Sequence, residues 1–283
     1  MSNKLNILVA YPYMRKDVIE ILNQNKNNIR FLLDSGAFTA WKAKKEINLD
    51  DYCRFIESLP FEPWKYFSLD VIGDAKKSMD NYELMLKRGF KPIPIFTRGE
   101  DPSVIEDYYK TSEVVGLGGL VGTTGNKGFV KGIMKKVNGR KVHWLGFTNK
   151  MFLKIYKPYM CDSSSLTMSG RYGQFELFDK KNGNWTKLSK KDFVNKPEKK
   201  ILDLICSYNF KVEDFSKEEN WREPVGLSSE ISFQSHVRAQ GLYFKKLSTL
   251  YFVAPIGSVT QPHFNRILKA HKREGENEIN NNS

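Results

Sequence analysis

Short apolar runs alternate with amphipathic stretches along the first 165 residues of the chain. Each run is only a few residues long, as the buried strands of a parallel sheet are. The amphipathic stretches predict helices over Asp50–Leu59, Ala75–Arg88, Pro102–Lys110 and Lys127–Val137. The seven predicted strands are Asn6–Tyr11, Phe31–Asp34, Tyr66–Val71, Pro92–Thr97, Val114–Leu120, Val142–Phe147 and Tyr159–Ser163. Strands that alternate with helices in this way predict βαβ units and a parallel sheet.

The number of strands decides between two architectures. An eighth strand, predicted around Gln174–Phe178, would close the sheet into a (β/α)8 barrel. The alternative is an open doubly wound sheet, but no Gly-x-Gly-x-x-Gly motif follows the first strand. We therefore expect an α/β protein with a TIM-like (β/α)8 barrel as its catalytic core, over residues 1–178.

The composition changes after the predicted eighth strand. Residues 180–200 are polar and rich in lysine, which indicates a loop or an insertion. Helical patterns follow over Ile201–Asn209 and Ser229–Leu247. We expect residues 179–272 to pack on the barrel or complete it, and residues 273–283 to be a disordered tail.

Composition excludes several classes of protein. With 40% hydrophobic and 13% aromatic residues, the chain can bury a sizeable core and is not a disordered polypeptide. No apolar run approaches the roughly 20 residues of a membrane span, and the N-terminus does not resemble a signal peptide. Three scattered cysteines, Cys53, Cys161 and Cys206, predict neither disulfides nor a zinc site, so we expect a cytoplasmic protein without metal.

The charge favours a polyanionic partner. Forty-five Lys and Arg residues against 32 Asp and Glu residues leave a formal net charge of +13. Nucleic acid is the usual partner of such a chain, although a genome biased toward lysine and asparagine codons is an alternative explanation.

Three of the predicted strands have an aspartate at or next to their carboxyl end, at Asp34, Asp70 and Asp162. In a parallel barrel the loops after the strands converge on one opening, so these carboxylates should meet there. Aspartates also cap the helices that follow strands, but three anions at one opening repel one another and indicate a functional site. Glycines at the end of another strand, Gly118 and Gly119, would let a flat ligand approach the backbone, unless they serve tight strand packing.

Five motifs follow one another along residues 30–176: Asp34-Ser35-Gly36-Ala37-Phe38, the strand that ends in Asp70, Gly118-Gly119-Leu120, His143-Trp144-Leu145-Gly146, and the segment from Asp162 to Gln174. Together they resemble the guanine transglycosylase family. That family includes the tRNA-guanine (queuine) transglycosylases and the phage-type DpdA enzymes that insert 7-deazaguanines into DNA. The run Asp162–Ser165 and the short chain are more similar to the phage DNA branch.

The resemblance implies a (β/α)8 barrel and a base-exchange reaction. A carboxylate attacks C1′ of the nucleoside, guanine leaves, and a deazaguanine attacks the covalent glycosyl-enzyme. By position, Asp162 resembles the nucleophile, Asp34 the acid/base, and Asp70 the carboxylate that binds guanine. The residue types fit, because two carboxylates allow a double displacement and a third can accept the N1–H and N2–H₂ donors of guanine.

The resemblance also assigns a base site. Phe38 would stack on one face of the base and Leu145 would pack on the other, while Ser35 and the backbone of Gly118, Gly119 and Leu120 would contact its edge. Arg171 would bind a phosphate, unless it forms a surface salt bridge. The implied partners are guanine sites in DNA and a free 7-deazaguanine base, with no cofactor and no membrane, and we expect a monomer.

The sequence departs from the family pattern in three places. The cysteine-rich zinc motif of the tRNA enzymes is missing, and so is the glutamine of their fourth strand, since Ile95–Gly99 contains none. Leu166-Thr167-Met168 replaces a Pro-Thr-Arg motif, so one expected cation is lost. We expect His143 to be a strand-packing residue rather than a general base.

Other functions fit the same residues less well. The closest alternative is the same exchange on tRNA. A barrel that only binds nucleic acid would not require the three intact aspartates, and a hydrolase of free nucleosides or glycosides would not require a net charge of +13.

Overall fold

The computed structural model describes residues 4–120, 127–165, 173–194, 197–221, 226–254 and 261–280. The chain divides into two compact units. We call residues 6–163 and 247–252 the sheet unit, and residues 1–5, 164–246 and 253–283 the hairpin unit. The first boundary therefore falls after Ser163 rather than at the predicted residue 178, and the chain later returns to the sheet unit for six residues, Leu247–Phe252.

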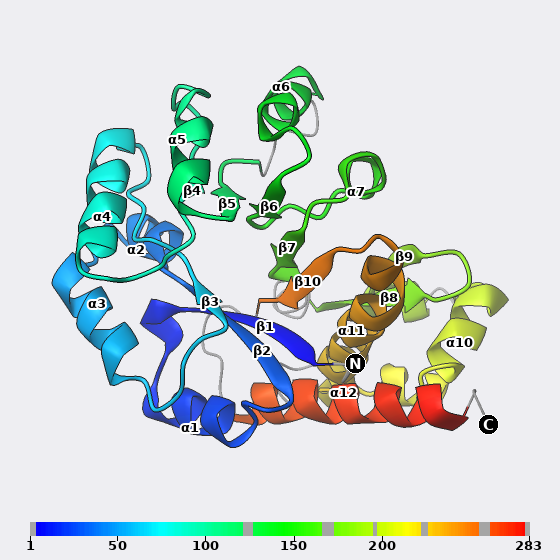
Figure 1. Ribbon diagram of the computed structural model, residues 1–283. Coiled ribbons are helices and arrows are strands. Elements are labelled where there is room, and N and C mark those ends of the chain that lie inside the picture. The colour runs from blue at the N-terminus through cyan, green and yellow to red at the C-terminus, as the bar shows by residue number, and fades with distance from the viewer. Residues whose placement is uncertain are drawn as a thin grey trace. The chain divides into compact units, whose positions relative to one another are not determined.

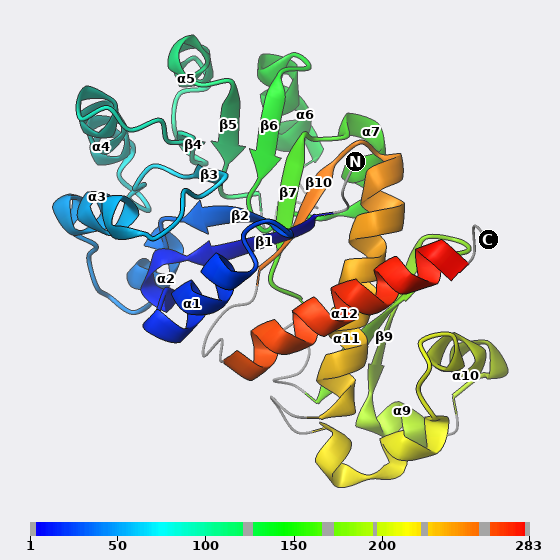
Figure 2. The same ribbon diagram turned by 60° about the horizontal axis from the view of Figure 1, so that its bottom comes forward.

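The sheet unit is built on a curled, parallel sheet of eight strands (Figures 1 and 2). Their order is β3-β2-β1-β10-β7-β6-β5-β4, so neighbours in the chain are mostly neighbours in the sheet. The strands are β1 (Leu5–Ala10), β2 (Ile29–Asp34), β3 (Lys65–Tyr66), β4 (Ile95–Phe96), β5 (Val114–Leu117), β6 (Lys141–Trp144), β7 (Met160–Ser163) and β10 (Leu250–Val253). Most of their residues are buried, as expected for a sheet that helices cover.

Helices link the strands and lie around the outside of the sheet (Figure 2). They are η1 (Tyr11–Tyr13), α1 (Lys16–Gln24), α2 (Ala37–Lys42), α3 (Leu49–Ser58), α4 (Ala75–Lys87), α5 (Val104–Thr111), α6 (Lys127–Val137) and α7 (Lys150–Tyr156). Three of them begin at a side-chain cap, because Asn48, Asp74 and Asn149 accept backbone N–H groups of the first turn. The predicted alternation of strands and helices is thus confirmed.

The strand predicted around Gln174–Phe178 forms, but its place as the eighth strand of the large sheet was wrong. Gln174–Asp179 forms β8, which pairs antiparallel with β9 (Asn184–Ser189) in a separate two-stranded sheet of the hairpin unit. The eighth strand of the large sheet is β10, far along the chain. The two segments differ in pattern: β8 alternates buried and half-exposed residues over most of its length, as a strand of an antiparallel hairpin does, whereas β10 is a continuous apolar run.

Backbone hydrogen bonds also join the two ends of the strand order. Beyond β3, Ser68 N–H donates to the carbonyl of Ile93 at 2.9 Å, and Ile93 N–H donates to the carbonyl of Tyr66 at 2.8 Å. Phe67 and Ile93 form a parallel bridge just before β4.

The hairpin unit surrounds an aromatic core beside β8 and β9. Its other elements are α9 (Lys190–Val194), α10 (Lys199–Cys206), η3 (Val212–Ser216), η4 (Glu218–Trp221), α11 (Leu227–Ala239), the π-turn η5 (Gln240–Phe244) and α12 (Gln261–Asn280). The buried core consists of Phe175, Leu177, Leu188, Ile205, Tyr208, Phe215, Trp221 and Ile231. The lysine-rich segment is therefore not a loop, because β9 pairs with β8 and buries Leu188 between its lysines.

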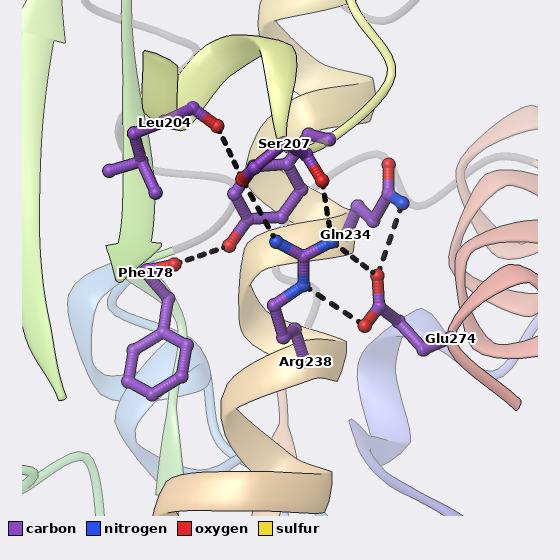
Figure 3. Close-up of polar contacts among 7 residues, drawn as sticks. Phe178, Leu204, Ser207, Gln234, Arg238 and Glu274 are labelled. Carbon is purple, nitrogen blue, oxygen red and sulfur yellow. Dashed lines mark hydrogen bonds and ion pairs between the residues drawn. The ribbon is translucent and has the colours of Figure 1, made fainter. Parts of the chain in front are cut away.

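A buried ion pair joins α11 to α12, which crosses it (Figures 2 and 3). Arg238 donates to both carboxylate oxygens of Glu274 at 3.0 Å, while Gln234 donates to the same carboxylate at 3.2 Å. The guanidinium also donates to the carbonyl of Ser207 at 3.2 Å and lies 3.6 Å from the centre of the Tyr208 ring. The predicted disordered tail was wrong for residues 273–280, which continue α12 and provide Glu274.

Among the described helices, none combines the length and the hydropathy that crossing a bilayer demands.

Candidate functional site

The sheet unit brings together three carboxyl groups from three strands. Asp34 ends β2, Asp70 lies four residues beyond β3, and Asp162 lies in β7. They are close enough that the charges of Asp70 and Asp162 both raise the pKa of Asp34. The convergence expected from the strand ends is therefore present, and the sheet holds the three groups in three different ways.

Asp34 occupies a tight turn between β2 and α2. Gly36 begins α2 with a φ of +79°, and an added Cβ would lie 2.2 Å from Cδ of Pro12, so only glycine fits. The Gly36 N–H donates to Oδ2 of Asp34 at 3.1 Å. Burial, followed by the neighbouring Asp70 and Asp162 charges, raises the Asp34 pKa to about 7. Asp34 can therefore both give and take a proton near neutral pH.

Asp70 is fixed by Ser35. The Ser35 hydroxyl donates to Oδ1 of Asp70 at 2.8 Å, and the same hydroxyl oxygen accepts the N–H of Ala37 at 3.2 Å. Burial raises the pKa of Asp70 to about 6, and the Ser35 hydrogen bond opposes that rise. Ser35, directly after β2, is thus linked to Asp70, four residues beyond β3.

Asp162 is held through one oxygen only. Its Oδ1 contacts Nε2 of His143 at 2.9 Å and accepts the Gly146 N–H at 3.0 Å. Gly146 reaches this position because its φ of +63° turns the chain sharply after β6. Among the described residues, Oδ2 of Asp162 has no hydrogen-bond partner. The geometry therefore fixes the carboxylate and leaves one oxygen for another group.

His143 packs in the sheet, as expected, but it also contacts Asp162, which the sequence reasoning did not predict. The side chain is fully buried, with the Phe67 ring centre at 5.0 Å and the Phe252 ring centre at 6.3 Å. Its Nδ1 has no partner among the described residues, so the neutral tautomer that carries its hydrogen on Nε2 fits the contact with Asp162. Register could have revealed it: His143 pairs with Met160, which places His143 and Asp162 on the same face.

The expected base-contacting residues are placed as follows. Gly119 has a φ of +69°, and an added Cβ would lie 2.6 Å from Cβ of Arg98, so the backbone approaches closely here. Leu120 is buried, whereas Gly118 and Leu145 are half-buried. Phe38 is 55% exposed and stacks on Trp41 with ring centres 5.9 Å apart. Arg171 and residues 166–168 lie outside the described residues.

Glu100 is a further carboxyl that the sequence reasoning missed. It follows β4, and both carboxyl oxygens are buried. Burial raises its pKa to about 7, the Thr97 backbone opposes the rise, and the Asp70 charge adds to it. No sequence pattern marks this residue, because its burial depends on neighbours from other strands.

A search of the described residues found no group of three or more His, Cys, Asp or Glu side chains able to hold a metal ion. Comparisons of the chain with protein-family models, with curated proteins and with solved structures found no match.

Proposed function

We propose that this chain is a guanine transglycosylase that acts on DNA, exchanging guanine for a 7-deazaguanine base through a covalent aspartyl intermediate. The observation that carries the proposal is the meeting of Asp34, Asp70 and Asp162 from three strands of one sheet. The order of the sequence motifs around them, which resembles the guanine transglycosylases, names the reaction.

Asp162 and Asp34 divide the chemistry between them. Oδ2 of Asp162 attacks C1′ of the nucleoside, the C1′–N9 bond breaks, and guanine leaves with the electron pair and a proton from Asp34. The Asp34 carboxylate then takes a proton from N9–H of the incoming base. Its N9 attacks C1′, and the bond to Asp162 breaks to restore the carboxylate. A pKa of about 7 suits Asp34 to both proton transfers.

Asp70 would select the base and His143 would hold the nucleophile. Guanine and 7-deazaguanine both present N1–H and N2–H₂ side by side, and one carboxylate accepts both donors. Because Ser35 occupies Oδ1 of Asp70 from the side, the carboxylate keeps one orientation. His143 and Gly146 similarly keep Oδ1 of Asp162 occupied, so that Oδ2 is the attacking oxygen.

We also propose that the curled sheet is a (β/α)8 barrel. The order of its eight parallel strands supports this, as do the hydrogen bonds that link Tyr66 and Ser68, at and beyond β3, to Ile93, just before β4. A closed barrel would place all eight strand ends around the opening where the carboxyls meet.

DNA is the proposed polymer, and two features favour it over tRNA. The segment at Asp162–Ser165 resembles the phage DNA enzymes, and the cysteines provide no counterpart to the zinc subdomain that supports tRNA docking in the tRNA enzymes. The target base must leave the helical stack, so single-stranded or locally unpaired DNA should react faster than a perfect duplex.

An exchange assay with the full-length chain tests this proposal. Labelled guanine is offered with matched DNA and RNA oligonucleotides and whole tRNA, and denaturant-resistant adducts are measured in parallel. We expect the wild-type protein to exchange guanine into DNA and to form an adduct with it. Asp162→Asn should do neither. Asp80→Asn, which changes an exposed aspartate on α4, is the matched control.

The possible failures are distinct. Exchange into tRNA alone would overturn the choice of polymer and leave the chemistry standing. Near-normal turnover by Asp162→Asn would mean that another group is the nucleophile. Release of base from free nucleosides, without exchange into any polymer, would favour the hydrolase instead.

A further inference from the structure

A cavity of about 460 Å³ lies beside Asp70, between α2 and the start of α4. Asp70 is the one proposed site residue that lines it; Phe38, Leu145 and Gly119 do not. The cavity therefore borders the proposed guanine site at Asp70. Its volume is large enough for a nucleoside and is not used by the reaction described above.

One wall of the cavity is an exposed aromatic ring. Trp41 is 54% exposed and lies nearly parallel to Phe38, with 25° between the rings. An indole face is a good stacking surface for a nucleobase. The aliphatic residues Ile47 and Ile72 line the same cavity.

Two lysines supply positive charge to the cavity. Lys45 and Lys77 both line it, as does Glu46, and the ammonium of Lys77 lies 3.6 Å from the exposed Glu46 carboxylate, a weak pair that a phosphate can replace. Asn81 donates to the Leu69 carbonyl at 3.0 Å, which leaves its own carbonyl oxygen as an acceptor at the cavity. An aromatic face with ammonium groups beside it suits a base that carries a phosphate better than it suits a free base.

We propose that this cavity binds the nucleotide next to the target guanine in the same strand, with its base on Trp41 and its phosphate between Lys45 and Lys77. The proposal rests on the proposed function, since it requires the target guanine to be bound at Asp70. Binding the neighbour there would hold the strand open while the target base is out of the stack. The subsite takes single-stranded DNA or an unpaired stretch, because a paired neighbour cannot stack on Trp41.

Binding of fluorescent single-stranded DNA to the Asp162→Asn protein tests the subsite without turnover. Three oligonucleotides are compared, each with one guanine. The first has normal nucleotides on both sides of the guanine, the second an abasic residue on its 5′ side, and the third an abasic residue on its 3′ side. We expect Trp41→Ala to weaken binding of the normal strand about 5- to 150-fold, equivalent to about 1–3 kcal/mol. On one of the two abasic strands the same substitution should have little effect. Trp64→Ala, in a tryptophan that does not line the cavity, is the control.

Salt dependence gives a second measurement that does not involve the aromatic ring. Lys45→Ala and Lys77→Ala should each reduce the logarithmic salt slope by about 0.7 on a single strand, as loss of one phosphate contact does. Lys76→Ala is the matched control, since Lys76 is 85% exposed and pairs with Asp80. An unchanged slope for both Lys45→Ala and Lys77→Ala would remove the phosphate from the proposal.

Three results would overturn the subsite. The first is that Trp41→Ala binds DNA as the parent protein does, and the second is that it loses binding equally on the normal strand and on both abasic strands. The third is that Trp41→Ala loses binding of free 7-deazaguanine, which would make the cavity the base site itself. Failure of the proposed function is distinguishable from these. Suppose that no exchange occurs, yet the loss of DNA binding caused by Trp41→Ala still requires the base next to the guanine. The proposed subsite then stands and the proposed activity is wrong.

Discussion

Asp34→Asn should make the protein more stable at alkaline pH than the wild type. Burial and two neighbouring carboxyls raise the pKa of Asp34 from 3.8 to about 7 in the folded chain. In the unfolded chain the group ionises at its ordinary pKa. The folded chain therefore binds the proton on Asp34 more tightly than the unfolded chain does. The stability that this proton gives is present in full below about pH 4 and is lost as the pH rises through about 7.

The magnitude follows from the same pKa. A rise from 3.8 to about 7 is equivalent to about 4 kcal/mol. This is an upper limit, because Asp34 is only half-buried and water reaches part of it. Asparagine resembles the protonated carboxyl and has no charge to desolvate. The stability difference between variant and wild type should therefore be near zero at pH 4, grow through pH 6, and reach at most about 4 kcal/mol at pH 8.

Urea unfolding at pH 4, 5, 6, 7 and 8 measures this difference, with Asp80→Asn as the exposed-aspartate control. The midpoint should move with unchanged slope in urea, which shows that stability rather than compactness has changed. If the Asp34→Asn and wild-type curves stay parallel from pH 4 to pH 8, Asp34 ionises normally. Its proposed role as a proton carrier at neutral pH would then lose its basis.

Three further predictions concern other groups. His143→Leu should slow adduct formation about 10- to 150-fold, which is equivalent to the loss of a hydrogen bond to a charged group. His143→Gln keeps an N–H donor and should slow it less. Equal losses for the two variants in burst kinetics would refute a positioning role. Arg238→Met should lower the free energy of unfolding by up to about 3–5 kcal/mol, because it leaves the largely buried Glu274 carboxylate with the Gln234 amide but without a cation. Arg238→Met combined with Glu274→Met should recover much of the loss in thermal melts, and no recovery would contradict this. Elemental analysis should find no stoichiometric zinc, since the three cysteines are isolated in sequence, and one zinc per chain would refute that.

The local pattern of the chain was sufficient for much of the fold. A buried parallel strand is a short apolar run and a surface helix has an apolar stripe, so both can be read from neighbouring residues. This predicted the seven strands from β1 to β7 and four of the helices between them, α3, α4, α5 and α6. It also placed Asp34, Asp70 and Asp162 at strand ends, where a parallel sheet must bring them to one side.

The eighth strand required the tertiary structure. Gln174–Asp179 and Leu250–Val253 both have the composition of a strand, and the sequence gives no distance between either of them and β7. Strand pairing depends on residues far apart in the chain: Leu250 N–H donates to the carbonyl of Tyr159 across 91 positions, at 2.9 Å. The alternating pattern of β8 hinted at a hairpin, but only its partner β9 made the assignment definite.

The protonation and contacts of the site also came from the tertiary structure alone. His143 and Asp162 are 19 residues apart, and their hydrogen bond exists because β6 and β7 pair in one register. The raised pKa values of Asp34 and Glu100 come from desolvation by many atoms that no local pattern encodes. The sequence determined which chemical groups stand at the strand ends, because that depends on neighbours in the chain. Only the folded chain sets the distances through space. These distances decide which groups share a proton, which oxygen is free and where the cavity lies.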